Sequence, residues 1–96
     1  MKVYYVYILK CSDDTYYTGF TSNLESRIEQ HRQGKHSDSF TFKRRPVELV
    51  FQSEFTNVEI AIETEKQIKI WSRVKKEALI AGEFEKLPNL AKKKFK

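Results

Sequence analysis

Apolar and polar positions along the first 20 residues of this 96-residue chain follow the pattern of two β-strands. Residues 3–10 are rich in tyrosine, valine and isoleucine, and a second β-prone stretch occupies 16–19. Between them, Ser12-Asp13-Asp14 has the composition of a tight turn. Because the connection is short and polar, the sequence predicts an antiparallel hairpin.

A third strand is expected at 47–55, after a loop at 35–46. The loop is polar apart from Phe40 and Phe42, and it ends in a basic run before a proline. Within the expected strand, apolar residues alternate with polar neighbours. These apolar residues are Val47, Leu49 and Phe51.

Helical spacing of apolar residues predicts three helices, at about 23–33, 57–71 and 74–81. The last two are separated by a bend at Trp71-Ser72. The first two helices each begin at a hydroxyl residue followed three positions later by a glutamate, which is the spacing of a capping box. The two boxes are Ser22 with Glu25 and Thr56 with Glu59.

The predicted order is strand, strand, helix, strand, helix, helix, which indicates an α+β fold with a small mixed sheet covered by helices. The length allows one domain. We place that domain at 1–84 and expect a basic C-terminal tail at 85–96. A single cysteine, Cys11, excludes an intrachain disulfide and a multi-cysteine zinc site.

The net charge of +5 is unevenly distributed. Residues 1–42 carry five basic and five acidic side chains, whereas 43–96 carry 13 basic and eight acidic. A polyanion such as nucleic acid is the obvious partner for the basic half, and a solvated surface is the alternative. The longest apolar run, 3–9, is too short to span a membrane, and we expect a cytoplasmic protein without a membrane partner.

Three polar residues occupy faces that the helical pattern assigns to the core. Glu65 lies on one helical stripe with mostly apolar neighbours, so its carboxylate binds a metal, forms a salt bridge to a nearby lysine or arginine, or lies at an exposed edge of the stripe. Arg27 and His31 are four positions apart and share a face, which suits anion binding or proton transfer, or else a surface pair at the edge of the stripe. The other members of the Glu65 stripe are Val58, Ala61, Ile68 and Ser72.

Taken in order, these residues resemble the GIY-YIG nuclease family. The first half-motif is Tyr5-Val6-Tyr7 and the second is Tyr17-Thr18-Gly19, followed by Arg27, His31 and Glu65 at the expected places. Tyr5 stands where glycine is usual, and Thr18 where an aliphatic residue is usual. The resemblance covers roughly 3–81, and the stretch 61–76 is especially similar to small stand-alone bacterial members. It implies a three-stranded antiparallel sheet flanked by helices.

The same resemblance implies an endonuclease that hydrolyses DNA phosphodiester bonds with one divalent ion, Mg²⁺ or Mn²⁺. Glu65 is then the metal ligand and Arg27 holds the scissile phosphate. Either Tyr7 or Tyr17 serves as base or water-positioning group, with His31 assisting or accepting the proton. Structural or little sequence preference is expected, with DNA repair or recombination as the expected setting.

Six basic residues are expected to follow the nucleic-acid backbone without reading its sequence. Two other functions remain open, namely a non-catalytic nucleic-acid-binding module with the same fold and a protein-interaction domain that uses Phe40 and Phe42. A protein partner that supplies specificity is also expected, and Asn89 is a loose candidate for a late active-site asparagine. The six basic residues are Lys43, Arg44, Arg45, Lys69, Lys75 and Lys76.

Overall fold

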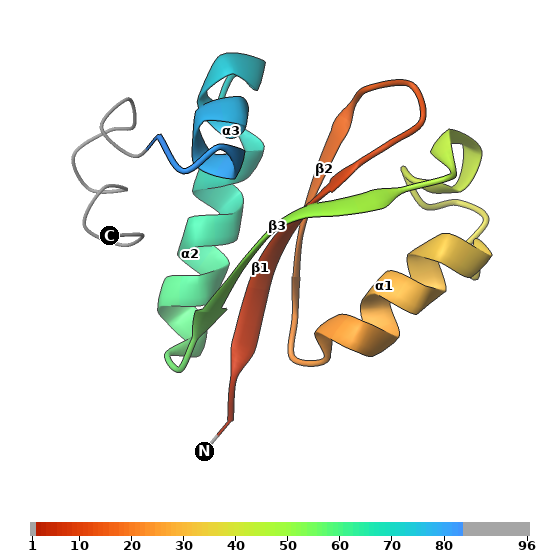
Figure 1. Cartoon of the computed structure of the whole chain (residues 1–96). Coiled ribbons are helices and arrows are strands. Elements are labelled where there is room, and N and C mark those ends of the chain that lie inside the picture. Colours follow the sequence, from red (N-terminus) through yellow and green to blue (C-terminus); the bar gives the residue numbers. More distant parts are fainter. Residues whose placement is uncertain (1, 84–96) are drawn as a thin grey trace.

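The computed structural model describes residues 2–83 as a three-stranded sheet with helices on both faces (Figure 1). The strand order is β2-β1-β3, and both neighbours pair with β1 antiparallel. The elements are β1 (Tyr4–Lys10), β2 (Tyr16–Thr21), α1 (Leu24–Gln33), the 3₁₀ turn η1 (Phe42–Arg44), β3 (Glu48–Phe55), α2 (Val58–Lys69) and α3 (Arg73–Ile80).

The predicted order of elements is confirmed, but the mixed sheet expected from that order is wrong. The strands β2 and β3 run in the same direction, yet β1 lies between them, so no parallel pair forms. The antiparallel sheet implied by the family resemblance is therefore the observed one. The expected tail 85–96, with Asn89, lies outside the described residues.

Each face of the sheet carries its own hydrophobic cluster, and Figure 1 shows α1 on one face with α2 and α3 on the other. Because successive strand residues point to opposite faces, β1 supplies both clusters. Within residues 2–83, no helix is long and apolar enough to cross a membrane. The buried residues on the α2 and α3 face are Val6, Ile8, Ala61, Ile68, Trp71, Ala78 and Leu79. Those on the α1 face are Tyr7, Leu9, Cys11, Ile28 and Val47.

A β-bulge in β3 changes which side chains reach each cluster. Opposite Ile8 lies Phe51, but opposite Leu9 lies Leu49, so Val50 is the extra residue. As a result Leu49 packs on the α1 face and Phe51 on the α2 and α3 face. The simple alternation expected for this strand is wrong at Phe51, because a bulge reverses the facing of every residue beyond it.

The residues that cap α1 and α2 are asparagines. The side-chain oxygen of Asn23 accepts a hydrogen bond from the Ser26 N–H at 3.1 Å, and that of Asn57 accepts one from the Ile60 N–H at 3.0 Å. Asparagine caps at least as well as serine or threonine, so each helix begins one residue later than the predicted capping box. The hydroxyl residues expected in this role were Ser22 and Thr56.

The bend between α2 and α3 is confirmed, and α3 is attached to the hairpin. Trp71 is buried at the bend, and Ser72 caps α3. The Tyr16 hydroxyl of β2 donates to the Glu77 carboxylate at 3.1 Å, while the Arg73 guanidinium lies 4.7 Å above the Tyr16 ring. These contacts hold the start of β2 beside α3.

Candidate active site

The centre of the site is a hydrogen bond between the strand residue Tyr7 and the helix residue His31. The Tyr7 hydroxyl lies 3.0 Å from Nε2 of His31, and both side chains are buried. Gly19 faces Tyr7 across the β1–β2 pair, and a Cβ at Gly19 would lie 2.4 Å from the Tyr7 ring. The glycine therefore provides the space in which the Tyr7 ring lies over β2.

Burial is the main reason that the pKa of Tyr7 is raised well above 10. The charges of Tyr17 and Glu65 raise it further, while Arg27 lowers it through its charge and a side-chain interaction. The phenol is therefore protonated at neutral pH. A partner that accepts its proton is needed before Tyr7 can act as a base.

His31 is suited to accept that proton. Burial lowers its pKa from the ordinary 6.5, and the positive charges of Arg27 and His36 lower it further. The imidazole is therefore neutral at pH 7, and one of its ring nitrogens has a free lone pair.

Because His31 is buried, we expect the folded protein to lose stability in mild acid. Because its folded pKa is depressed, the unfolded chain binds the proton more readily. Stability is fully present above about pH 6.5 and is lost as the pH falls through the folded pKa. For the wild type, the urea concentration at the midpoint of unfolding should fall from pH 7.5 to pH 5 by the amount expected for about one titrating group. The fall should be smaller in His31→Gln. In His36→Gln, whose imidazole is exposed, it should equal that of the wild type. An equal fall in all three proteins would show that His31 is not its cause.

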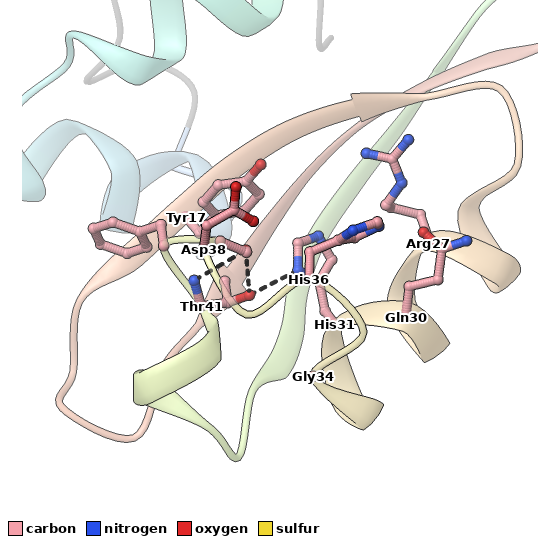
Figure 2. A pocket seen from close by; sticks show the side chains of 10 residues that line it. Tyr17, Arg27, Gln30, His31, Gly34, His36, Asp38 and Thr41 are labelled. Carbon is pink, nitrogen blue, oxygen red and sulfur yellow. Dashed lines mark hydrogen bonds between the residues drawn. The ribbon is translucent and has the colours of Figure 1, made fainter.

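A pocket of about 310 Å³ opens beside this pair, between α1 and the loop that follows it (Figure 2). Tyr17, Arg27 and His31 all line it, so the structure brings together three residues that the sequence placed on two different elements. The Tyr17 ring is tilted against His31 with centroids 5.1 Å apart. The other lining residues are Gln30, Gly34, His36, Asp38, Ser39, Phe40 and Thr41.

Tyr17 also lines a second pocket, of about 220 Å³, on the side of β2 that faces α2 and α3. Lys69 and Lys76 line this second pocket. Burial lowers the pKa of Lys76. The candidate site therefore continues around β2, an edge strand, with Tyr17 common to both of its parts.

Glu65 reaches this region from α2. Its side chain is only 12% exposed, and Oε2 lies 2.7 Å from Nζ of Lys69, one helical turn further on. Ala61 and Ile68 of the predicted stripe are buried, and the neighbouring Thr64 is buried with them. Glu65 thus lies at the margin of the apolar stripe and forms the salt bridge that was one of its three expected environments.

A divalent ion fits Glu65 as one ligand of its shell. A single carboxylate suits Mg²⁺, which retains several waters and binds substrate phosphate. The Lys69 side chain that now neutralises Glu65 is 52% exposed, so its ammonium can move into solvent without opening the core. Within residues 2–83, no cluster of three or more histidine, cysteine or acidic residues could hold a metal by itself.

The two arginines of the basic run are bound within the molecule. Arg44 lies 4.0 Å above the Phe40 ring, donates to the Phe40 carbonyl at 2.8 Å and pairs with Asp13 at 3.1 Å. Arg45 lies 4.6 Å above the Phe42 ring and donates to its carbonyl at 2.9 Å. The aromatic rings proposed as a protein-binding surface are therefore each covered on one face by an arginine.

The excess positive charge is concentrated in a shorter segment than the whole of 43–96. Lys43 and Lys75 are exposed, but residues 84–96 contain five lysines and one glutamate. Residues 1–83 contain 13 basic and 12 acidic side chains, so they carry +1 of the net +5. The excess lies in the last 13 residues, outside the described domain.

Sequence reasoning missed two residues beside His31, namely Ser39 and Thr41. Thr41 is 1% exposed, and its hydroxyl lies 2.8 Å from Nδ1 of His31 and 3.1 Å from the Ser39 hydroxyl. Both lie in a stretch whose composition indicated only a loop. A buried threonine in such a stretch gives no periodic signal, because loop geometry depends on tertiary contacts.

A match to a known family shows that the fold is that of a catalytic domain of the nuclease type. The sequence profile of the GIY-YIG catalytic domain matches residues 3–78, most of the chain. The chain belongs to this family, whose members are generally dependent on a divalent metal and act on nucleic acid.

Relatives of similar length carry the family designation UPF0213. A UPF0213 protein of Natronomonas pharaonis is 45% identical over 80 residues, which are 83% of this chain and 93% of that one. A UPF0213 protein of Staphylococcus haemolyticus is also 45% identical over 80 residues, which are 83% of this chain and 96% of that one. The NMR structure of the UPF0213 protein from Bacillus halodurans is similar at 36% identity with a TM-score of 0.55, covering 95% of this chain and 93% of that one. The NMR structure of a protein from E. faecalis is similar at 28% identity with a TM-score of 0.62, covering 93% of this chain and 94% of that one.

Proposed function

We propose that this protein is a divalent-metal-dependent endonuclease that hydrolyses phosphodiester bonds in DNA with structural or little sequence preference. The observation that carries the proposal is the hydrogen bond between a protonated Tyr7 and a neutral His31 beside the pocket that Arg27 lines. This combination offers a proton acceptor and a cation at one place. Phosphodiester hydrolysis requires both.

Arg27 is the group that would bind the scissile phosphate. It lines the pocket and lies close enough to Tyr7 for its charge to favour the phenolate. A guanidinium binds phosphate oxygens bidentately, and it stabilises the negative charge that builds up in the transition state.

Tyr7 and His31 would handle the proton of the attacking water. Transfer of the Tyr7 proton to Nε2 of His31 produces a phenolate and an imidazolium, and the phenolate can then accept a proton. Tyr17, which is only partly buried and lines both pockets, would orient the water or the phosphate. The two tyrosines thus receive different roles because only Tyr7 is hydrogen-bonded to the histidine.

Glu65 would hold the divalent ion, Mg²⁺ or Mn²⁺, after Lys69 leaves its carboxylate. The ion would supply positive charge at the leaving oxygen. Lys69 would then be free to approach the phosphate backbone together with Lys76, which lines the same pocket.

The test is nicking of a supercoiled plasmid by the full chain. We expect open-circular product with Mg²⁺ or Mn²⁺ and none with EDTA. The absence of nicking with either ion, across a range of salt concentrations, would contradict the proposal.

A non-catalytic DNA-binding module is the second candidate, and the Glu65–Lys69 ion pair favours it. In this structure Lys69 already neutralises the carboxylate that a metal would need. Salt-sensitive binding of the plasmid in a gel-shift assay, without nicking under any of the conditions above, would support this candidate instead.

A further inference from the structure

His31 is held at both ring nitrogens, and its second partner is the loop residue Thr41. Nε2 lies 3.0 Å from the Tyr7 hydroxyl and Nδ1 lies 2.8 Å from the Thr41 hydroxyl. The Thr41 hydroxyl in turn lies 3.1 Å from that of Ser39, which lines the pocket. Figure 2 shows His31, Thr41 and the dashed contacts between α1 and the loop. Four side chains therefore form one chain of hydrogen bonds from the buried strand to the pocket.

The hydrogen-bond network links the tautomer of His31 to the directions in which the hydroxyl groups donate. A neutral imidazole has one N–H donor and one acceptor nitrogen. A protonated Tyr7 that donates to Nε2 makes Nε2 the acceptor, and Nδ1 then carries the hydrogen. In this arrangement Nδ1–H donates to the Thr41 hydroxyl, which can donate in turn to Ser39. The Ser39 oxygen also accepts the Thr41 backbone N–H at 3.3 Å.

We propose that Thr41 is a positioning residue that holds His31 in the tautomer protonated at Nδ1. Its role in turnover rests on the proposed nuclease function, whereas its role in fixing the tautomer does not. In this tautomer the Nε2 lone pair points at the Tyr7 hydroxyl. When Tyr7 gives up its proton, its O–H bond breaks, an Nε2–H bond forms and the electron pair stays on the phenolate oxygen. Thr41 remains an acceptor for Nδ1–H throughout, so it also stabilises the imidazolium.

The burial of Thr41 makes the loss of its hydroxyl costly. Thr41 is almost fully buried, and an unpaired Nδ1–H in that environment would cost the desolvation of a donor. With the hydroxyl absent, the proton would favour Nε2, which would then donate to the Tyr7 oxygen and could no longer accept the Tyr7 proton. Partners that fix the tautomer of a metal-ligating histidine generally contribute 10- to 100-fold to affinity or activity, and we expect an effect of the same order for Thr41.

The experiment compares Thr41→Val, which keeps the shape but lacks the hydroxyl, with Thr41→Ser, which keeps the hydroxyl, in the full chain. Long-range ¹H–¹⁵N NMR correlations identify the protonated ring nitrogen of His31 directly. We expect the tautomer protonated at Nδ1 in the wild type and in Thr41→Ser, and a shift toward Nε2 in Thr41→Val. Plasmid nicking should show kcat about 10- to 100-fold lower in Thr41→Val with little change in KM, and recovery in Thr41→Ser. The exposed loop variant Ser37→Ala serves as control and should match the wild type.

The NMR result decides the proposal separately from the nuclease function. A wild type protonated at Nε2 overturns the proposal without any variant, and so does an unchanged tautomer in folded Thr41→Val. A shifted tautomer with unchanged kcat overturns the role in turnover. If the wild type does not nick DNA but the tautomer shifts as expected, the proposed function fails while the positioning of His31 by Thr41 is supported.

Discussion

Glu65→Gln should reduce metal-dependent nicking about 100-fold or more while leaving the fold intact. The amide keeps the shape of the side chain but removes the anionic charge that would hold the ion, and a bound ion stabilises the transition state by several kcal/mol (about 100-fold or more). Measurement of the nicking rate at saturating Mg²⁺ or Mn²⁺, together with thermal unfolding, separates the two effects. Stability should change little, because the lost partner is a half-exposed lysine.

The matched control is Glu63→Gln, which removes the same charge from an exposed position of the same helix. It should nick at the wild-type rate. Equal nicking rates for the wild type and Glu65→Gln would show that Glu65 is not part of the site. An equal loss of nicking in both variants would indicate a general effect of the charge on DNA binding.

Gly19→Ala should disturb the site from the opposite strand. The added methyl group would lie 2.4 Å from Cζ and the hydroxyl oxygen of Tyr7, which is too close for any real contact. Because the Tyr7 ring is fully buried, any shift that makes room for the methyl group disturbs its packing and its hydrogen bond to His31. We expect a loss of about 1–3 kcal/mol in the free energy of unfolding and a nicking rate reduced about tenfold or more.

A double-mutant cycle tests the cause of this effect. In a Tyr7→Leu background the phenol ring is absent, so Gly19→Ala should cost much less stability there than in the wild type. An equal cost in both backgrounds, measured by urea unfolding, would show that the clash with Tyr7 is not the reason for the glycine.

The strands and helices were predictable because their hydrophobic patterns are strong, whereas the exact packing of β3 was not. The bulge at Val50 depends on how β3 pairs with β1, and that pairing has no local signature in the sequence. The helix starts were displaced by one residue because two neighbouring side chains, Ser22 and Asn23 at α1, can both cap a helix. Tertiary contacts decide between them.

The candidate site was predictable where its residues lie on regular elements. Helical spacing indicated Arg27 and His31, the family resemblance added Tyr17, and the structure brings all three to one pocket. The contribution of the 35–46 loop was not predictable, since the same stretch supplies both the Thr41 hydroxyl and the ring that covers Arg44. A basic run in sequence also gives no indication that its arginines are satisfied within the molecule.

The small net charge of residues 1–83 bears on how the chain would find DNA. Each phosphate neutralised by a protein cation releases about one condensed counter-ion, and this release dominates the salt dependence of binding. Arg44, Arg45 and Lys69 are already engaged within the domain, and its other cations are nearly balanced by its acidic side chains, so residues 1–83 carry little net attraction for DNA. Residues 84–96, with five lysines and one glutamate, carry +4 of the net +5. Attraction to DNA and cleavage of DNA would then depend on different parts of the chain, the first on its end and the second on the nearly neutral domain.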